Sequence, residues 1–379
     1  MKLLIAPNAL KGSLSAPDAA EAIREGVSRA CPNAEYRLLP VADGGDGTAE
    51  VLGRALGAEH VELIVEDPLG RPVRGAFQWL AGTQTAVIDV ATASGLRLLA
   101  VTQQNPLFSS SHGTGQLMHA AIERGARRIV LGAGGSATVD GGAGLMQALG
   151  ATLADEDGAP VPRGGRGLLA LHRLDVTPLE RRLANVELVV LSDVKNPLLG
   201  AEGAAAVFGP QKGADSSMVT DLECGLSRLA DFILCGKGVR IHDTPMGGAA
   251  GGIAASLRGL FGARLVPGID WVLDAIDFDA ELDGASWVIT AEGHLDSQTL
   301  SNKAPFGVAR RARARGVPVV ALCGGADDDP AVLAPFDVVL PICRRPVQIA
   351  DALRLGRPWL VLASEQLGRL IRVYRGTEC

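Results

Sequence analysis

The stretch GAGGSATVDGGAG, residues 132–144, decides how this chain is first interpreted. It follows the apolar residues 129–131 and precedes the largely apolar residues 145–149, so we predict a strand, a glycine-rich turn and a helix in that order. Glycine tolerates positive φ and lets a ligand approach the backbone, and a helix N-terminus offers unpaired N–H groups with a partial positive charge. The stretch therefore predicts a phosphate-binding loop.

Two other interpretations of the same loop stay open. Residues 132–137 fit the loose dinucleotide fingerprint G-x-G-x-x-G/A, which would suit a NAD-dependent dehydrogenase of a small hydroxy acid. Gly141 and Gly142 follow, and because each interior glycine costs a helix about 1 kcal/mol, we expect the helix to begin after Asp140, with that residue as its cap. The loop could also serve close packing alone. No G-x-x-x-x-G-K-[ST] sequence occurs, so it is not a P-loop.

Composition narrows the class of protein. With 379 residues the chain exceeds the roughly 250 to 300 at which one core stops growing, so two domains are expected. Hydrophobic residues make up 47% and aromatic residues 4%, and 48 glycines supply turns, a mix that favours α/β packing. The net charge of -6 with scattered Lys and Arg argues against nucleic acid as a partner.

Nothing in the sequence predicts export or membrane insertion. None of the six cysteines forms a C-x-x-C pair, which is typical of a reduced cytosolic chain. The apolar residues 3–6 are interrupted too early for a signal peptide, and no apolar run approaches the ~20 residues of a membrane span. We therefore expect a cytoplasmic protein, and the sequence leaves open whether it forms a homo-oligomer.

Five short apolar runs are typical of buried parallel strands. They are residues 2–6, 37–41, 287–290, 317–322 and 337–340. A helix capped by Ser15 follows the first run and a helix over residues 49–56 follows the second. From His60 onwards, alternating runs and the turn at residues 67–70 indicate antiparallel hairpins instead.

We therefore predict an α/β protein with a discontinuous, flavodoxin-like domain around a five-stranded parallel sheet, made of residues 1–57 and 263–379. Residues 58–262 would form an inserted mixed α/β domain that carries the glycine-rich loop, with a helix running from after Gly115 to Glu123. The active site would lie in the cleft between the carboxyl edge of the sheet and the insertion, since open α/β sheets bind ligands at that edge.

Polar side chains suited to chemistry follow the predicted strands. Five carboxylates lie at strand exits, where they can bind Mg²⁺ or take a proton from a hydroxyl: Asp43, Asp46, Asp193, Glu292 and Asp296. Lys11, Lys212 and Lys303 lie in loops and suit phosphate or carboxylate, although any one of them alone is more simply explained as a solvated side chain. His112 and His294 also lie in loops, and no zinc or Ser-His-Asp pattern occurs.

Taken together, the motifs resemble those of the bacterial class I glycerate kinases. They run in order along nearly the whole chain: IAPNALKGSLSA from Ile5, PVADGGDGTAEVL from Pro40, GTGQL from Gly113, GAGGSATVDGGAG from Gly132, SDVKNPLLGAEGAAAVFGPQKGA from Ser192, GGAAGG from Gly247 and AEGHLDSQTLSNKAPFGVA from Ala291. The resemblance implies a two-domain α/β fold and ATP-dependent phosphorylation of D-glycerate, usually to 2-phosphoglycerate, with Mg²⁺ in an interdomain cleft.

The resemblance also suggests roles for the candidate residues. Gly134, Gly135, Ser136 and Thr138 would hold the ATP phosphates, and Lys11, Ser13, Lys303 and Asn196 the glycerate or the transferred phosphoryl group. Asp193 would be the general base or a metal ligand, Asp296 a second catalytic carboxylate, and Asp43 and Glu292 ligands of Mg²⁺. This set is sufficient for phosphoryl transfer, which asks a protein mainly for positioning and charge neutralisation.

Four positions depart from the family pattern. Asn8, Gln116 and His294 stand where the family usually has Asp, Glu and Arg, and Ala291 replaces a usual Gly. A histidine lacks the bidentate, permanently charged guanidinium that suits carboxylate or phosphate. The departures leave open a kinase re-tuned to a related small hydroxy acid, and a weakened nucleotide- or metabolite-binding homologue.

Overall fold

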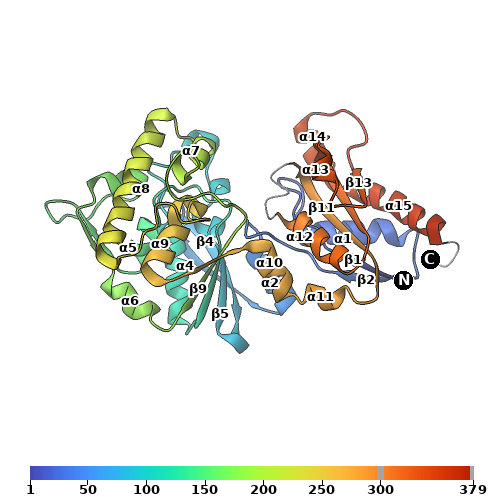
Figure 1. Ribbon diagram of the computed structural model, residues 1–379, viewed down its shortest axis with the longest axis horizontal. Coiled ribbons are helices and arrows are strands. Elements are labelled where there is room, and N and C mark those ends of the chain that lie inside the picture. The colour runs from blue at the N-terminus through green and yellow to red at the C-terminus, as the bar shows by residue number, and fades with distance from the viewer. Residues whose placement is uncertain (297–302, 376–379) are drawn as a thin grey trace. The chain divides into compact units, whose positions relative to one another are not determined.

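The computed structural model describes residues 1–296 and 303–375, and the chain divides into two compact units (Figure 1). Unit 1 is Met1–Asp43 together with Ile269–Cys379, and unit 2 is Gly44–Gly268. Each unit has its own sheet and its own hydrophobic core. The parallel-sheet domain is therefore discontinuous and the second unit is inserted into it. Residues 297–302 of the last family motif lie outside the described residues, as does Cys379.

Unit 1 is built on five parallel strands in the order β13-β12-β11-β1-β2. The strands are β1 (Lys2–Ile5), β2 (Glu35–Leu38), β11 (Ala285–Leu295), β12 (Val319–Ala326) and β13 (Val338–Pro341). This flavodoxin-like order confirms the predicted fold class. The direction in which strands are added reverses between β1 and β11, and open α/β sheets bind ligands at the carboxyl ends of two such strands.

Two strands of unit 1 differ from their predicted bounds. β2 ends at Leu38, and the chain beyond it stays bonded to the segment after β1, because the Leu39 and Val41 N–H groups donate to the Ile5 and Pro7 carbonyls at 2.8 and 3.0 Å. β11 continues to Leu295 instead of ending at Thr290, since β12 pairs with it as far as Ala326. Glu292 and His294 therefore lie within a strand, not in a loop.

The described helices of unit 1 begin and end as follows: α1 (Ala16–Ser28), α10 (Gly268–Ala275), α11 (Phe278–Glu281), α12 (Ala304–Ala314), α13 (Pro330–Leu333), α14 (Ile349–Arg354) and α15 (Gly356–Arg375). Ser15 caps α1, as predicted, because its hydroxyl accepts from the Asp18 N–H at 3.2 Å. α1 and α15 pack closely, since a Cβ on Gly26 would lie 2.2 Å from the Val361 carbonyl oxygen.

Unit 2 contains a six-stranded mixed sheet in the order β10-β9-β6-β5-β4-β3 and a separate pair, β7 with β8. Their bounds are β3 (Glu59–Glu66), β4 (Pro72–Leu80), β5 (Thr85–Asp89), β6 (Arg128–Gly132), β7 (Thr152–Ala154), β8 (Arg173–Asp175), β9 (Glu187–Ser192) and β10 (Arg264–Pro267). β3, β4 and β5 pair antiparallel, which confirms the predicted hairpins. β5, β6, β9 and β10 are parallel, so their carboxyl ends meet at one edge.

The described α-helices of unit 2 are α2 (Thr48–Leu56), α3 (Ala91–Ser94), α4 (His112–Glu123), α5 (Ala143–Ala148), α6 (Thr177–Leu183), α7 (Ala204–Phe208), α8 (Ser216–Lys237) and α9 (Ile253–Phe261). α4 starts at His112, so the GTG motif forms its first turn, whereas we expected it to precede the helix. Close packing explains the first glycine, because a Cβ on Gly113 would lie 1.9 Å from the Glu66 carbonyl oxygen.

The unit boundaries fall after Asp43 and after Gly268, whereas we predicted them after residues 57 and 262. α2 lies in unit 2 because the Asp89 carboxylate, at the end of β5, accepts from the Gly47 and Ala49 N–H groups at 3.0 and 3.1 Å. β10, which we did not predict, pairs in parallel with β9 and extends unit 2 towards Gly268.

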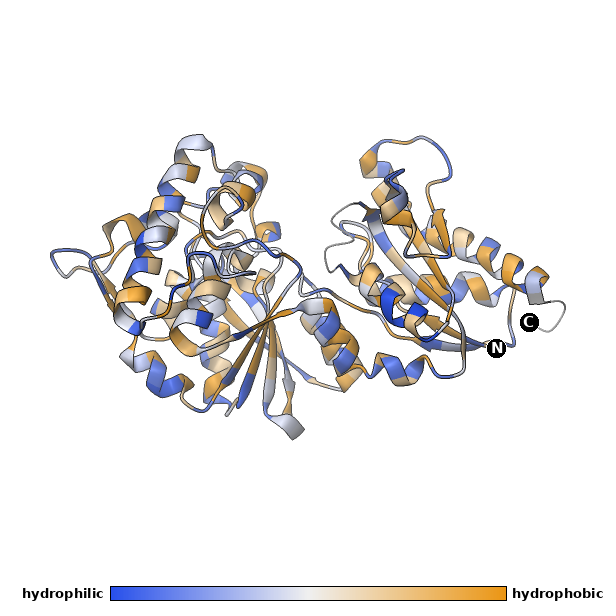
Figure 2. Cartoon of the chain, in the orientation of Figure 1, coloured by the Kyte–Doolittle hydropathy of each residue, from blue (hydrophilic) through white to orange (hydrophobic). Residues whose placement is uncertain are grey.

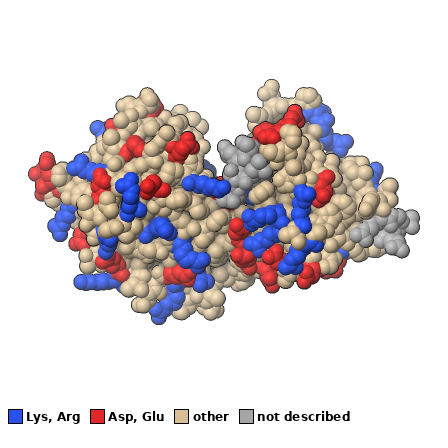
Figure 3. Space-filling model, viewed as in Figure 1, with Lys and Arg blue, Asp and Glu red and all other residues tan. Residues whose placement is uncertain are grey.

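Apolar and charged residues are distributed in a similar way in the two units. Figure 2 shows long apolar stretches in strands of both units, while the helices carry both apolar and polar residues. On the face shown in Figure 3, Lys and Arg are interspersed with Asp and Glu over each unit. Of the helices within residues 1–296 and 303–375, none has both the length and the apolar content needed to cross a bilayer.

Candidate active site

Six of the predicted residues lie in unit 1, around the ends of β1 and β11. They are Lys11, Ser13, Asp43, Glu292, Asp296 and Lys303. Lys11 follows β1, Asp296 follows β11, and these two strands are neighbours in the sheet. The carboxyl group of Glu292 interacts electrostatically with Lys11, Lys303, Asp43 and Asp296. The reversal of strand order therefore brings together residues that the sequence separates by almost 300 positions.

Glu292 is the buried member of this group. Glu292 is 5% exposed, and its Oε2 has no hydrogen-bond partner among the described residues. Burial, with a smaller contribution from the Asp43 carboxylate, raises the pKa of Glu292 to about 8 although Lys303 and Lys11 oppose the shift. A buried carboxylate with an unpartnered oxygen is stabilised by a bound cation.

Asn8 modifies the charge beside Glu292. Its Nδ2 donates to Asp43 Oδ2 at 3.2 Å, and its Oδ1 accepts from the Ala9 N–H at 2.8 Å. An aspartate here, as the family pattern would have it, would place a further buried carboxylate against Asp43. The asparagine instead supplies a donor, so this departure removes a repulsion between like charges.

The remaining side chains of this group differ in whether they already make hydrogen bonds within the protein. Lys303 lies at the N-cap of α12, and its Nζ donates to Asp296 Oδ1 at 3.3 Å. The Ser13 hydroxyl donates to the Leu353 carbonyl at 2.6 Å, which ties the loop after β1 to α14. Lys11 is exposed. Lys11 is therefore accessible to an anionic ligand, whereas Ser13 already has a structural hydrogen bond.

Asp43 and Glu292 suit a Mg²⁺ ion that is also coordinated by a substrate phosphate. Mg²⁺ in proteins is typically held by one or two carboxylates together with water and substrate phosphate. Asp43 and Glu292 supply two buried carboxylates. Within residues 1–296 and 303–375, no group of three or more His, Cys, Asp or Glu side chains is arranged to hold a metal ion. These residues fit an ion that a phosphate also coordinates, and not a cage closed by protein alone.

The predicted phosphate loop lies in unit 2, directly after β6. Gly135 is exposed and has φ +73°, a conformation that favours glycine. Within the described part of the chain, the N–H groups of Gly135 and Ser136 donate to no backbone carbonyl. Gly134 has another role: its N–H donates to the Gly44 carbonyl at 3.0 Å, and a Cβ on it would lie 2.5 Å from the Gly45 Cα. Packing therefore explains Gly134, while the N–H groups of Gly135 and Ser136 are not used by the backbone of the described residues.

A buried lysine lies behind this loop. Lys212, at the end of the 3₁₀ turn Pro210–Lys212, is 4% exposed, and its Nζ donates to Ser136 Oγ at 2.9 Å and to the Thr138 carbonyl at 2.8 Å. Burial lowers the pKa of Lys212 to about 7, against the attraction of Asp140. The simpler expectation of a solvated lysine is therefore wrong. Thr138 is fully buried, and its hydroxyl has no partner among the described residues.

Asp140 organises the end of the loop. Its carboxylate accepts from the Gly142 N–H at 3.0 Å, from the Gly144 N–H at 3.2 Å, and from the Ser111 N–H and hydroxyl at 2.9 and 2.8 Å. Burial raises the pKa of Asp140, and these donors oppose that shift. The predicted cap is confirmed in this sense, although α5 begins only at Ala143, with Gly142 at the N-cap. In a dinucleotide-binding fold, Ala137, the third position of the fingerprint, would already lie in the helix. Here the helix begins at Ala143, so this loop departs from that fold.

Asp89 is a site-supporting residue that the sequence did not single out. It lies at the end of β5, is buried, and caps the N-terminus of α2. Gly132 leaves room for it, because a Cβ there would lie 2.6 Å from Asp89 Oδ1. Burial raises the pKa of Asp89 to about 7, although the Ala49 N–H opposes the shift. A single carboxylate therefore holds residues 44–47 against the start of the phosphate loop.

We expect Asp89→Asn to change how stability depends on pH. The carboxyl group titrates near 3.8 in the unfolded chain and near 7 in the folded protein, so between these values the folded state binds more protons. The free energy of unfolding of the wild type, relative to the non-titrating variant, should therefore fall as pH rises from ~5 to ~7, by up to about 1.4 kcal/mol per pH unit. Denaturant unfolding of both proteins at several pH values measures this difference, and a constant difference would contradict it.

Asp193 and Asn196 follow β9, at the same sheet edge as the phosphate loop. Both are half-buried, and Asn196 Nδ2 donates to the Glu202 carbonyl at 2.8 Å. The second glycine stretch packs between the two loops: the Gly248 N–H donates to the Asn196 carbonyl at 3.0 Å, and the Gly251 carbonyl accepts from the Gly141 N–H at 2.9 Å. Packing thus accounts for that stretch.

Asp46 and His294, two further candidates, lie in polar contacts at the surface. Asp46 Oδ2 is 2.8 Å from Arg97 Nε, and both side chains are substantially exposed. His294 Nε2 lies 3.0 Å from Asp327 Oδ1 on the solvent side of β11. Ala291, also on β11, is fully buried and leaves a glycine unnecessary at this point of the strand.

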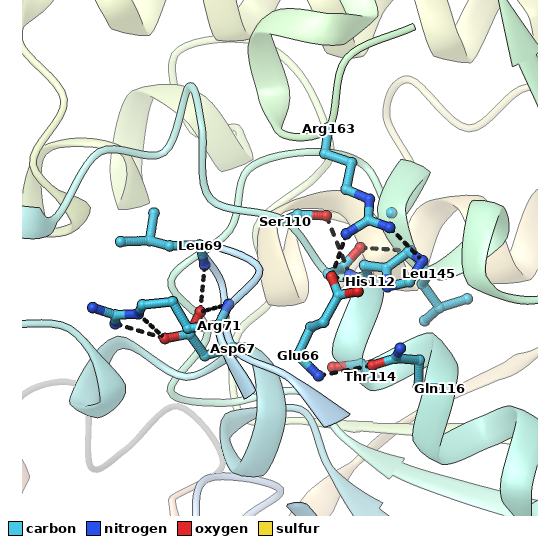
Figure 4. A network of polar contacts seen from close by, with 12 residues as sticks. Glu66, Asp67, Leu69, Arg71, Ser110, His112, Thr114, Gln116, Leu145 and Arg163 are labelled. Carbon is cyan, nitrogen blue, oxygen red and sulfur yellow. Dashed lines mark hydrogen bonds and ion pairs between the residues drawn. The ribbon is translucent and has the colours of Figure 1, made fainter. Parts of the chain in front are cut away.

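Gln116 belongs to the polar network drawn in Figure 4. Its Oε1 accepts from the Glu66 N–H at 2.8 Å, so an amide serves this bond without adding a second negative charge beside the Glu66 carboxylate. That carboxylate pairs with Arg163 and lies 3.4 Å from His112 Nδ1, and Arg163 in turn donates to His112 Nε2 at 3.0 Å (Figure 4). The departure at residue 116 is therefore compatible with its surroundings.

Similarity to known proteins extends over almost the whole chain. The glycerate kinase family model matches residues 3–372. Glycerate kinase of Bacillus subtilis (strain 168) is 44% identical over 375 residues, 98% of each chain. Glycerate 2-kinase of Escherichia coli (strain K12) is 42% identical over 333 residues, 88% of this chain and 87% of that protein. A solved structure from Salmonella typhimurium LT2 described as a glycerate kinase 2 superposes with a TM-score of 0.85 at 39% identity, over 99% of both chains.

The fold, the site residues and these similarities define the protein as an enzyme of the phosphotransferase class. The chain belongs to the glycerate kinase family, as the resemblance of its motifs suggested.

Proposed function

We propose that this protein phosphorylates D-glycerate with ATP in the presence of Mg²⁺ and that the product is 2-phosphoglycerate. The observation that carries the proposal is the family match over residues 3–372. The relative named glycerate 2-kinase supports transfer to the 2-hydroxyl.

For the nucleotide, we assign the loop after β6. The amides of Gly135 and Ser136 and the Ser136 hydroxyl bind the ATP phosphates, since neither N–H donates to a backbone carbonyl of the described residues and Gly135 is exposed. Gly134 and Thr138 support the loop through the packing and the buried carbonyl described above. Their assignment as direct phosphate ligands, made from the sequence, is less well supported than that of Gly135 and Ser136.

For the acceptor, we assign the lysines at the ends of β1 and β11. Lys11 and Lys303 pair with the glycerate carboxylate or with the transferred phosphoryl group, and Ser13 and Asn196 contribute polar contacts. Lys11 lies in the loop that follows β1, Lys303 lies at the N-cap of α12, and β1 is the neighbour of β11 in the sheet. Because charge-assisted hydrogen bonds to carboxylate and phosphate are the strong ones, this pair would dominate acceptor binding.

Asp43 and Glu292 would hold Mg²⁺, on the evidence of their burial and of the unpartnered Glu292 Oε2. A Mg²⁺ ion held by these residues would supply positive charge against the phosphates. Asp193 accepts the proton of the attacking hydroxyl, and Asp296 holds Lys303 in place or serves as a second carboxylate of the site. That the two substrates meet in a cleft between the units stays a prediction from the sequence, as do a cytoplasmic location and homo-oligomer formation.

The test is a panel of small hydroxy acids with ATP and Mg²⁺, read out as ADP release coupled to NADH oxidation. We expect D-glycerate to stimulate ADP release strongly and the phosphorus NMR spectrum of the product to be that of 2-phosphoglycerate. A different preferred acid would favour the re-tuned kinase. Nucleotide binding without turnover on any acid would favour the weakened homologue. Binding of NADH to the protein, measured by NADH fluorescence without the coupling enzymes, would instead favour the dehydrogenase interpretation.

A further inference from the structure

Lys212 is a buried cation that the roles assigned above do not use. Its ammonium group lies behind the phosphate loop, and both of its hydrogen bonds in the structure go to neutral oxygens, Ser136 Oγ and the Thr138 carbonyl. A buried charge is costly unless it is paired with an opposite charge. The loop therefore holds a cationic group in a place where an anionic ligand would stabilise it.

We propose that Lys212 is a positioning and charge-balancing residue of the nucleotide site, which polarises the Ser136 hydroxyl and takes up a proton when a phosphate binds to the loop. The inference rests on the proposed function, because it needs a phosphate-bearing ligand at Gly135 and Ser136.

The hydrogen-bond geometry gives the first step. Since Lys212 Nζ donates to Ser136 Oγ, the hydroxyl hydrogen of Ser136 is directed to another acceptor. A phosphate oxygen at the Gly135 and Ser136 amides can accept it. A charged donor behind the hydroxyl strengthens that bond, because hydrogen bonds in a chain polarise one another. Lys212 thus acts on the ligand through Ser136 and does not touch it.

The electrostatic surroundings give the second step. Asp140 is the charged group that acts on Lys212 in the described structure, and its carboxylate already accepts from Ser111, Gly142 and Gly144. Burial outweighs this attraction and lowers the pKa of Lys212 to about 7, so near neutral pH a fraction of the free protein carries a neutral amine. A phosphate with close to two negative charges nearby favours the ammonium form, and the proton comes from the solvent.

The experiment measures protons directly. Calorimetric titration of the wild-type protein with ATP and Mg²⁺ at pH ~8, two units above the phosphate pKa of about 6, is repeated in buffers of different ionisation enthalpy. The dependence of the observed heat on the buffer counts the protons bound per ATP. We expect the wild type to take up a larger number of protons than Lys212→Met, by an amount that approaches one per site.

Affinity supplies a second readout. Loss of a charge-assisted bond should raise the Kd for ATP in Lys212→Met by about tenfold to a hundredfold near pH 7. The ratio of the wild-type Kd to that of the variant should rise as pH increases from ~7 to ~9, because only the wild type can lose this proton. Lys237→Met is the matched control: Lys237 is a partly exposed lysine of the same unit that pairs with Glu180, and it should behave as the wild type does.

The outcomes separate the two proposals. Absence of ATP binding to the wild type would overturn both. Wild-type binding with the same Kd and the same proton count as Lys212→Met would overturn the role of Lys212 and leave the proposed function standing. If Lys212→Met does not fold, Lys212→Gln, which keeps a neutral donor towards Ser136, replaces it.

Discussion

Asp193→Asn is expected to lower the kcat of glycerate phosphorylation by about 10²- to 10⁴-fold, the usual contribution of a positioned general base. The amide keeps the shape of the side chain but cannot take the proton of the attacking hydroxyl. Asp193 follows β9, beside β6. We expect the effect on turnover and not on ATP affinity, because a general base acts in the transfer step. ADP release at saturating ATP and glycerate measures kcat, and calorimetry measures ATP binding.

A matched control separates the role of Asp193 from a general effect of charge. Asp243 is an exposed aspartate of the same unit that pairs with Arg240. Surface ion pairs contribute little, so Asp243→Asn should keep kcat within about twofold. Full turnover by Asp193→Asn would remove Asp193 from the mechanism, whereas equal losses in both variants would indicate that the net charge of unit 2 matters.

Asp140→Leu is expected to lower the free energy of unfolding by about 3 to 5 kcal/mol, because breaking a buried polar network leaves several donors unsatisfied. Three backbone N–H groups and the Ser111 hydroxyl would lose their acceptor at once. These donors lie at the N-cap of α4 and at the N-cap and first turn of α5, so we expect the loss of stability to be largest where these two helix starts meet. Denaturant unfolding measures the global effect, and hydrogen exchange at Gly142 and Gly144 measures the local one.

Asp155→Ala is the comparison that tests the role of burial in this prediction. The Asp155 carboxylate also accepts from two backbone N–H groups, those of Asp157 and Ala159, but in an exposed turn between β7 and β8. Water can replace those bonds, so we expect a loss within about 1 kcal/mol. Similar losses in the two variants would mean that the network around Asp140 contributes no more than an ordinary turn.

The fold was largely predictable because local patterns and strand order agree. The short apolar runs at residues 2–6 and 287–290 correspond to β1 and β11, and the long hairpin-rich interruption correctly indicated an inserted unit. β10 was missed because its four residues, RLVP, carry no alternation and lie next to a glycine. The boundary after Asp43 was missed because the contact that draws α2 into unit 2 comes from Asp89, far along the chain.

The candidate site was predicted unevenly. Residue type and position after a strand pointed to Lys11, Asp43, Asp296 and Lys303, and the structure brings these around Glu292. Lys212 was weighed as a solvated lysine, since its immediate neighbours are Gln and Gly and give no sign of burial. Its position in the motif that ends FGPQKGA was the available signal. Gly134, a glycine expected to face a ligand, packs against Gly45, a contact that neighbouring residues do not indicate.

By itself, the sequence determined the order of the elements, the parallel sheet with its insertion, and the glycine-rich stretch after residues 129–131, because periodicity, turn residues and caps act over a few neighbouring positions. Only the tertiary structure decided which polar groups lose their water. Glu292 and Lys212 are buried by segments distant in sequence, Lys212 against Ser136 across 76 positions. Desolvation depends on everything packed around a group, so the charges of this site follow from the fold and not from the local sequence.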